Sequence, residues 1–172
     1  STQQEEAAIK AFEKSLQLDS ISASNWNILA SMYMNAGHND DAERAIKKTL
    51  SLDSANVNGW LNLGGLYQGT GRKAEAEQIY KKLLRQDSSQ VAVWINLGGM
   101  YRVSGRIAEA EQAFKTCLQR DPLADGCWLN LGSLYEATGR ETEARQLYDN
   151  MLQRDSSLTM HRVLGSYFLT NQ

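Results

Sequence analysis

The chain has 172 residues, 42% of them hydrophobic, and its 18 basic and 20 acidic side chains leave a formal charge of −2. A field this weak argues against binding to nucleic acid or another polyanion by bulk electrostatics. A single proline and few β-branched runs favour helix throughout and no sheet. No apolar run approaches the roughly 20 residues that span a bilayer, so we expect no membrane insertion.

The two cysteines, Cys117 and Cys127, have neither zinc-like spacing nor a Cys-x-x-Cys pattern. Two cysteines are too few for a disulfide framework. The simplest interpretation is two reduced thiols, and the redox state of the pair stays open at this point. Residues 1–4 carry no apolar segment of a signal peptide, although a cleaved signal would already be gone. The compartment therefore stays open, with the cytoplasm slightly favoured.

The first predicted element is an amphipathic helix over residues 3–18, whose apolar side chains share one face at helical spacing: Ala8, Ile9, Phe12 and Leu16. Ala8, Phe12 and Leu16 lie one 34-residue period ahead of Ala42, Ile46 and Leu50. The spacing therefore predicts that residues 3–18 are the second helix of a partial repeat.

An eight-residue stretch then recurs along the chain. It runs from Trp60 to Tyr67, from Trp94 to Tyr101 and from Trp128 to Tyr135, with a looser copy from Trp26 to Tyr33. The four tryptophans share a period of 34 residues, and a fixed period of roughly 20–50 residues is typical of stacked-repeat architectures. The period indicates the fold class, but it does not indicate any catalytic or binding chemistry.

Each copy reads as two helices joined by a short turn. The predicted repeats cover 23–56, 57–90, 91–124 and 125–157, and their second helices cover 39–52, 73–86, 107–120 and 141–154. The turns contain Gly37, Gly71, Gly105 and Gly139, where a helix ends in a left-handed residue. The inner faces combine a small residue, a large residue and leucine, as in Ala76, Tyr80 and Leu84. A further first helix over 158–170 lacks its partner, and the whole array, 1–172, is one domain.

The pattern Trp60-x2-Leu63-Gly64-x2-Tyr67, followed by Ala76 and Tyr80 and, in the third copy, by Pro122, resembles the tetratricopeptide repeat family. The resemblance covers nearly the whole chain. It implies an all-α, right-handed superhelical solenoid of antiparallel helix pairs. It also implies that the first helices line a concave groove that binds peptides or protein partners.

Helical geometry predicts which residues face that groove. The residue two after each tryptophan lies about 200° from it, on the side opposite the core, and in three copies it is asparagine. A carboxamide offers both a donor and an acceptor, which match the C=O and N–H groups of an extended peptide. Similar ladders occur in family members that hold extended peptides. The predicted peptide-binding residues are Asn62, Asn96, Asn130, Asn58, Leu61, Gly65, Ile95, Gly99, Arg102, Leu129 and Ser133.

Two structural alternatives to this ladder stay open. The amides could bridge adjacent first helices, or they could persist from repeat duplication. The first copy departs from the pattern, because Ile28 occupies the slot and Asn27 lies beside it. We therefore expect the ladder to stop at the second repeat.

We expect no enzymatic activity, no cofactor and no metal site. His38 and His161 are far apart in sequence and have no catalytic motif around them. The glutamates at positions 75, 109 and 143 begin second helices, where negative charge suits the helix dipole. Arg72, Arg106 and Arg140 lie close to them, and together these residues predict a solvated edge of mixed charge rather than a phosphate site.

The leading function is therefore a protein interaction module that binds an extended peptide or partner segment. One alternative is the recognition segment of a larger enzyme, such as a glycosyltransferase. Another is an assembly adaptor, because the unpaired helices at 3–18 and 158–170 leave apolar stripes that could stack head to tail. Truncation from a longer array would explain the unpaired helices as well.

Overall fold

The structure, a computed structural model, describes residues 2–18 and 21–154, and within them it is all-α. The helices are α1 (Thr2–Leu18), α2 (Ala23–Asn35), α3 (Asn39–Leu52), α4 (Val57–Gly69), α5 (Lys73–Gln86), α6 (Val91–Val103), α7 (Ile107–Arg120), α8 (Asp125–Ala137) and α9 (Glu141–Arg154). The chain divides into two compact units, Ser1–Gln86 and Asp87–Gln172, and the single array over 1–172 stays a prediction. The predicted last helix, at 158–170, lies outside the described residues.

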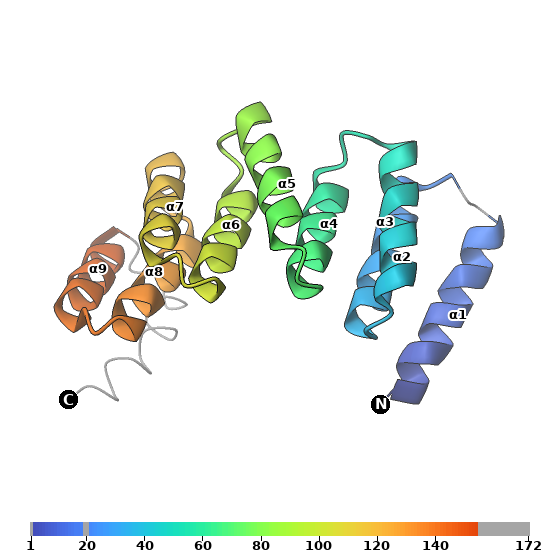
Figure 1. Ribbon diagram of the computed structural model, residues 1–172, viewed down its shortest axis with the longest axis horizontal. Helices are drawn as coiled ribbons and strands as arrows, with labels where there is room; N and C mark the ends of the chain where they lie inside the picture. Colours follow the sequence, from blue (N-terminus) through green and yellow to red (C-terminus); the bar gives the residue numbers. More distant parts are fainter. Residues whose placement is uncertain (1, 19–20, 155–172) are drawn as a thin grey trace. The chain divides into compact units, whose positions relative to one another are not determined.

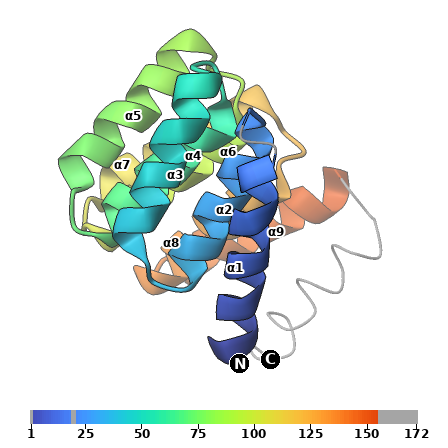
Figure 2. The same cartoon turned by 90° about the vertical axis from the view of Figure 1, so that its right-hand side faces the viewer.

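Unit 1 consists of α1 followed by the antiparallel pairs α2/α3 and α4/α5 (Figure 1). Helix α1 packs on α2, and the two lie side by side in both ribbon views (Figures 1 and 2). Helix α3 packs on α4, and α2 and α4, which are the first helices of their pairs, are also in contact. Within unit 1, the pair α2/α3 therefore contacts α1 before it and α4 after it, as expected for stacked repeats.

Unit 2 repeats the arrangement with the pairs α6/α7 and α8/α9. Helix α7 packs on α8, and the first helices α6 and α8 are in contact. The second helices α3, α5, α7 and α9 have the bounds that the 34-residue period predicts. The all-α fold of antiparallel helix pairs is thus confirmed, while the repeat boundaries stay a prediction.

The turns within the pairs depend on glycine. Gly37, Gly71, Gly105 and Gly139 have φ of 77°, 83°, 73° and 73°, the left-handed region that the sequence predicted. At the second of these turns Arg72 N–H donates to the Tyr67 carbonyl at 2.7 Å, while Gly71 N–H donates to Gln68 at 3.3 Å. This pair of bonds satisfies the last carbonyls of the helix and ends it.

The glycine in the repeated stretch permits close packing within each pair. A Cβ on Gly64 would lie 2.5 Å from the Tyr80 ring, and one on Gly98 would lie 2.5 Å from the Phe114 ring. Both rings are fully buried. The glycine of the first helix and the aromatic residue of the second therefore form one interlocked contact, which explains why both recur at the same period.

Three details of the predicted core are wrong. Ala8 is exposed, whereas Ile9 and Leu16 are buried with Leu29 of α2. Three leucines expected to complete the inner faces, Leu50, Leu84 and Leu118, are half-buried. The buried residues of the second helices precede the leucine positions by one: Thr49, Leu83, Cys117 and Met151. Trp128 is buried, but the other tryptophans are half-buried: Trp26, Trp60 and Trp94.

The interpretation of the two cysteines is also corrected by the structure. Cys117 and Cys127 form a disulfide, with their Cα atoms 6.2 Å apart, between the end of α7 and the start of α8. The interpretation as reduced thiols missed this bond because the two cysteines lie in different helices, which only the packing of α7 on α8 brings together.

Candidate functional site

The predicted peptide-binding residues of unit 2 lie on the neighbouring helices α6 and α8. Asn96, Arg102 and Ser133 are exposed, while the others are half-buried: Asn130, Ile95, Gly99 and Leu129. One stripe on α6 carries Ala92, Asn96, Gly99 and Val103, and the matching stripe on α8 carries Gly126, Asn130, Ser133 and Ala137. Both stripes surround a single carboxamide with small or aliphatic residues and contain no charged side chain.

The two asparagines of unit 2 make the same hydrogen bond. Asn96 Nδ2 donates to the Ala92 carbonyl at 2.9 Å, and Asn130 Nδ2 donates to the Gly126 carbonyl at 2.7 Å. Each bond folds the side chain back along its own helix, by four residues. Among the described residues, each carboxamide keeps its Oδ1 acceptor and one N–H without a partner, so each still offers one acceptor and one donor.

The preceding helix explains why Asn130 folds back. The positions of α6 that correspond to the partners of Asn62 in unit 1 are Ile95 and Gly99, which supply no polar side chain. A Cβ on Gly126 would lie 2.7 Å from Ile95 Cδ1, so α8 approaches α6 closely beside that isoleucine. A local carbonyl is therefore the available acceptor for Asn130.

In unit 1 the corresponding asparagine has a different environment. Asn62 Nδ2 donates to Asn27 Oδ1 at 2.9 Å and contacts Ser31 Oγ at 3.2 Å, so it bridges α4 to α2. Bridging of adjacent first helices was one of the open alternatives, and it holds at this position. Ile28, in the predicted asparagine slot of α2, is 49% exposed.

The remaining predicted residues of unit 1 also lie on α4. Asn58 is exposed, and Leu61 and Gly65 are half-buried. Because Asn62 already donates to Asn27 and Ser31 of α2, its amide is less available to a ligand than those of Asn96 and Asn130. The asparagines at 96 and 130 are therefore brought onto contacting helices, and Asn62 belongs to the other unit.

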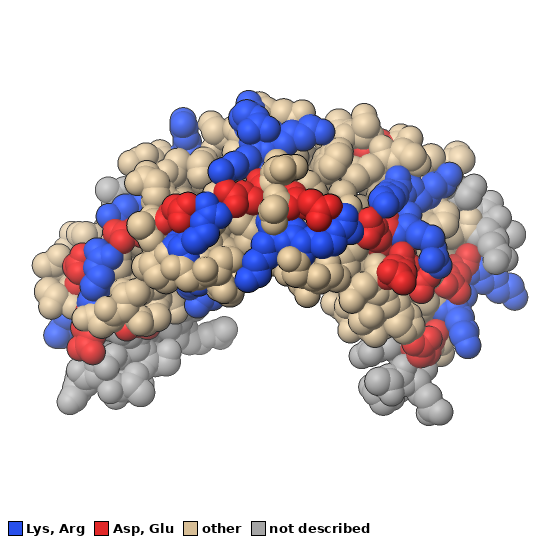
Figure 3. Space-filling model, in the orientation of Figure 1, with Lys and Arg blue, Asp and Glu red and all other residues tan. Residues whose placement is uncertain are grey.

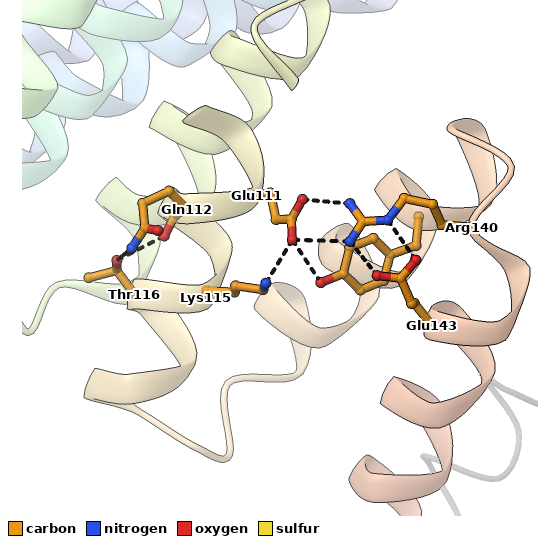
Figure 4. Close-up of polar contacts among 7 residues, drawn as sticks. Glu111, Gln112, Lys115, Thr116, Arg140 and Glu143 are labelled. Carbon is orange, nitrogen blue, oxygen red and sulfur yellow. Dashed lines mark hydrogen bonds and ion pairs between the residues drawn. The ribbon is translucent and has the colours of Figure 1, made fainter. Parts of the chain in front are cut away.

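A second cluster, which the sequence did not single out, surrounds Glu111 on α7 (Figure 4). Arg140 Nη1 donates to Glu111 Oε2 at 2.6 Å, Tyr135 Oη donates to Oε1 at 3.1 Å, and Lys115 Nζ lies 2.7 Å from Oε1. Arg140 also pairs with Glu143 and stacks on the Tyr135 ring, 4.3 Å from its centroid. Three chain segments, α7, α8 and the turn before α9, therefore meet at one carboxylate.

The Arg140 guanidinium, followed by Lys115 and Tyr135, lowers the pKa of Glu111 to about 2. Burial raises the pKa of Tyr135, and the hydrogen bond from its phenol to the Glu111 carboxylate also favours the un-ionised form. The glutamate is ionised at neutral pH with three donors on its two oxygens. Such a paired carboxylate connects the packed helices α7 and α8 to the turn before α9.

Unit 1 repeats this cluster around Glu43. Arg72 Nη1 donates to Glu43 Oε2 at 3.0 Å, Tyr67 Oη donates to Oε1 at 3.1 Å, and Lys47 Nζ lies 2.8 Å from Oε1. Lys47 leads the causes that lower the pKa of Glu43. Arg72 Nη2 also donates to Glu75 at 2.6 Å. The tyrosine of the repeated stretch thus connects one helix pair to the next in both units.

The surface shows the predicted edge of mixed charge. Blue and red side chains lie next to one another over each unit in Figure 3. His38 Nε2 lies 3.2 Å from Glu6, and His161 falls outside the described residues. Within residues 2–18 and 21–154, no group of three His, Cys, Asp or Glu side chains could hold a metal ion, and no helix is long and apolar enough to cross a bilayer.

Sequence reasoning missed the Glu43 and Glu111 clusters although a signal was present. Glutamate recurs at 43, 77 and 111, one period apart, like the tyrosines and arginines that contact it. It also missed Asn27 and Ser31 as partners of Asn62. No periodic signal marks them, because the corresponding positions carry Leu61 and Gly65 in the next repeat.

Comparison with known proteins gives a consistent result. A family model described as tetratricopeptide repeat matches residues 29–91 and 95–158. No curated protein sequence matches the chain. TTC0263, a thermophilic TPR protein of Thermus thermophilus, is 21% identical over 96% of this chain and 91% of that one, with a TM-score of 0.73.

Two further solved structures share the fold. MamA is 23% identical, with 87% of each chain covered and a TM-score of 0.66. YrrB, described as a TPR protein with an unusual peptide-binding site, is 17% identical over 95% of this chain and 84% of that one, with a TM-score of 0.61. At these identities the likeness concerns the fold alone.

Proposed function

The chain belongs to the tetratricopeptide repeat family, and on that premise we propose that the α6/α8 face of unit 2 binds the backbone of an extended peptide or partner protein segment. This fold suggests a scaffold for protein–protein interactions, and proteins built from these repeats are generally not enzymes. A protein or peptide is therefore the class of partner that the family supports.

One observation carries the proposal. Asn96 and Asn130 lie on contacting helices, each folded back on its own helix, and each keeps one acceptor and one donor among the described residues. A peptide backbone presents one donor and one acceptor per residue, whatever its sequence. The pair can therefore hold a segment without selecting its side chains.

The spacing of the helices suits an extended segment. Packed helices lie about 8–10 Å apart, and an extended chain rises about 3.3 Å per residue. Carboxamides on α6 and α8 would therefore meet backbone groups about three residues apart. Small neighbours such as Gly99 and Ser133 leave room for the close approach of a backbone.

Flanking side chains would add the remaining contacts. Half-buried Ile95 and Leu129 supply apolar surface, and exposed Arg102 supplies a positive charge at the edge of the face. In unit 1, Asn58, Leu61, Asn62 and Gly65 remain predicted contributors. Because its amide already donates to Asn27, we expect Asn62 to bind a peptide backbone more weakly than Asn96 or Asn130 does.

Selection from a random peptide library tests the proposal. The wild-type chain and the double variant Asn96→Ala, Asn130→Ala would be compared after circular dichroism shows equal helicity. Selected peptides, labelled with fluorescein, would be titrated with each protein, and the fluorescence anisotropy measured. Because each hydrogen bond contributes a net ~0.5–1.5 kcal/mol, we expect the double variant to bind roughly tenfold or more weakly.

Asn150→Ala is the matched control, because Asn150 is an exposed asparagine on α9 in the same unit. Its affinity should equal that of the wild type. N-methylation of peptide amides, which removes the backbone N–H, should weaken binding more than alanine substitutions in the peptide. Equal affinity of wild type and double variant would contradict the proposal and direct attention to other surfaces.

The assembly-adaptor alternative rests on the terminal helices. In α1, Ile9 and Leu16 are buried against α2, and the exposed residues described on α1 are Ala7, Ala8, Lys10, Ala11 and Lys14. Head-to-tail association of residues 3–18 with 158–170 stays a prediction. Light scattering across a dilution series tests it, and a monomer at high concentration would count against it.

A further inference from the structure

The junction between α7 and α8 is held by a covalent bond. The Cys117–Cys127 disulfide connects the last turns of α7 to the first turn of α8, and both cysteines are fully buried. Ala124 completes a cluster with them, and Trp94 and Ile95 of α6 pack against it. The bond therefore lies where three helices of unit 2 meet.

Unit 1 builds the corresponding junction without a covalent bond. At positions 68 residues earlier stand Thr49 and Gly59, and a Cβ on Gly59 would lie 3.1 Å from Thr49 Cγ2. There the start of α4 is held by Asn56, whose Oδ1 accepts from Gly59 N–H at 2.9 Å. Ser22 caps α2 in the same way, accepting from Asn25 N–H at 3.2 Å.

Helix α8 lacks such a cap. The position that corresponds to Ser22 and Asn56 is Ala124, which has no side chain that could accept from the first N–H groups of the helix. Cys127 occupies the position of Gly59, the residue whose N–H the Asn56 cap binds. Thus the covalent bond of unit 2 is made at the residue that the side-chain cap holds in unit 1.

We propose that the Cys117–Cys127 disulfide is a redox-controlled staple that fixes the start of α8 on the end of α7 in place of the missing N-cap. With the bond closed, the first turn of α8 cannot separate from α7. With the bond open, two thiols remain as small buried side chains, so unit 2 keeps its fold while the first turn of α8 becomes free to open.

The chemistry is thiol–disulfide exchange. A thiolate of a dithiol reductant attacks one sulfur of the pair and releases the other cysteine as a thiolate, which takes a proton; the second thiol of the reductant then displaces the first cysteine. Two electrons and two protons pass from the dithiol to the cysteines, and the reductant leaves as its own disulfide. Closure reverses this exchange, with oxidised glutathione as the acceptor.

Burial controls the rate of this exchange. Because neither sulfur is exposed, a reductant reaches the bond only after Trp94 and Ile95 of α6 move away from it. The closed form is therefore protected in the native state. A structural disulfide of this kind persists in an oxidising environment, which is where we expect the stapled form to work.

Hydrogen exchange by mass spectrometry tests the staple on the full chain, refolded with glutathione and then compared with and without dithiothreitol. We expect reduction to speed exchange at the end of α7 and the start of α8 on the order of 30- to 1,000-fold, the factor that corresponds to a typical disulfide. The α3–α4 junction, which has no cysteine, is the internal control and should not change.

Two variants complete the test. Cys117→Ala with Cys127→Ala should match the reduced wild type and ignore the reductant. Ala124→Ser, which copies the Ser22 cap, should restore part of the protection of the first turn of α8 in the reduced protein. If the double variant fails to fold, the comparison of oxidised and reduced wild type still decides.

Three outcomes would overturn the proposal. One is two free thiols, found by alkylation and mass measurement, after oxidative refolding. Another is equal exchange at the start of α8 in the oxidised and reduced protein. The third is native-state reduction by dithiothreitol at the rate measured in concentrated urea, since that rate would mean that burial does not protect the bond.

Discussion

The two units repeat one design at an offset of 68 residues. They differ in the hydrogen bonds of two asparagines at matching positions, Asn62 and Asn130. Asn62 in unit 1 bridges α4 to Asn27 and Ser31 of α2, whereas Asn130 in unit 2 donates to the Gly126 carbonyl of its own helix. The residue type and its helical position are the same. The difference teaches that the preceding helix decides whether a repeated asparagine supports the fold or remains available to a ligand.

The largest expected effect concerns the cluster that both units share. Glu111→Gln removes a carboxylate that is ionised at pH 7 and contacts Arg140, Lys115 and Tyr135. We expect the free energy of unfolding to fall by ~1–3 kcal/mol at pH 7, less than for a fully buried pair, because Arg140 is partly exposed. Glu43→Gln should act in the same direction. Glu141→Gln, at the exposed first residue of α9, removes only a charge that suits the helix dipole and should cost less, at most ~1 kcal/mol.

The pH dependence of that loss has a definite sign. The folded pKa of Glu111, about 2, lies below its ordinary value of 4.5, so its stabilisation is complete above about pH 4.5 and disappears as the pH falls towards 2. Urea unfolding of wild type and Glu111→Gln at pH 7 and at about pH 2.5 should show converging stabilities. The same difference in the free energy of unfolding at both pH values would contradict the lowered pKa of Glu111.

The effects of asparagine substitutions on stability should differ between the two units. Asn62→Ala leaves the polar groups of Asn27 and Ser31 without their bridge, and we expect a loss of ~1–2 kcal/mol. Asn130→Ala removes only a bond within one helix and improves helix propensity, so its effect should lie between zero and a gain of ~0.5 kcal/mol. Chemical denaturation of the two variants measures both values, and equal losses would break the comparison.

The buried tyrosines of the second helices provide a finer contrast. Tyr148 Oη donates to Glu136 at 3.1 Å, whereas Tyr80 Oη is buried without a partner among the described residues, and burial raises the Tyr80 pKa to about 12. Tyr148→Phe should cost ~0.5–1.5 kcal/mol. Tyr80→Phe should be neutral or stabilising, because Phe114 fills the same position of the next repeat. Thermal unfolding of both variants tests this order.

The smallest effect concerns two half-buried glycines of the first helices, Gly65 and Gly99. A Cβ on Gly99 would meet nothing within 4 Å, and one on Gly65 would approach Met34 Cε at 3.8 Å. Alanine at either position should stabilise its helix by ~0.5–1 kcal/mol. If the α6/α8 face binds a backbone closely, Gly99→Ala should nevertheless weaken peptide binding, and unchanged affinity would show that this glycine lies outside the contact.

Much of the fold could be predicted because it depends on local periodicity. The 34-residue spacing of Trp60, Trp94 and Trp128 is present in the sequence, and it predicts the helix bounds. The left-handed turn at Gly71 follows from the conformational freedom of one residue, independent of its neighbours. Such features need only residues that are close along the chain.

Contacts between different helices required the tertiary structure. The sequence determined that asparagine stands two residues after three of the tryptophans, but packing of α4 on α2 decided that Asn62 is bonded to Asn27. In the same way, two cysteines ten residues apart become a disulfide only because α7 ends where α8 begins to pack. Periodicity specifies which face of a helix a residue occupies, whereas the side chain that meets it depends on the position and residues of another helix.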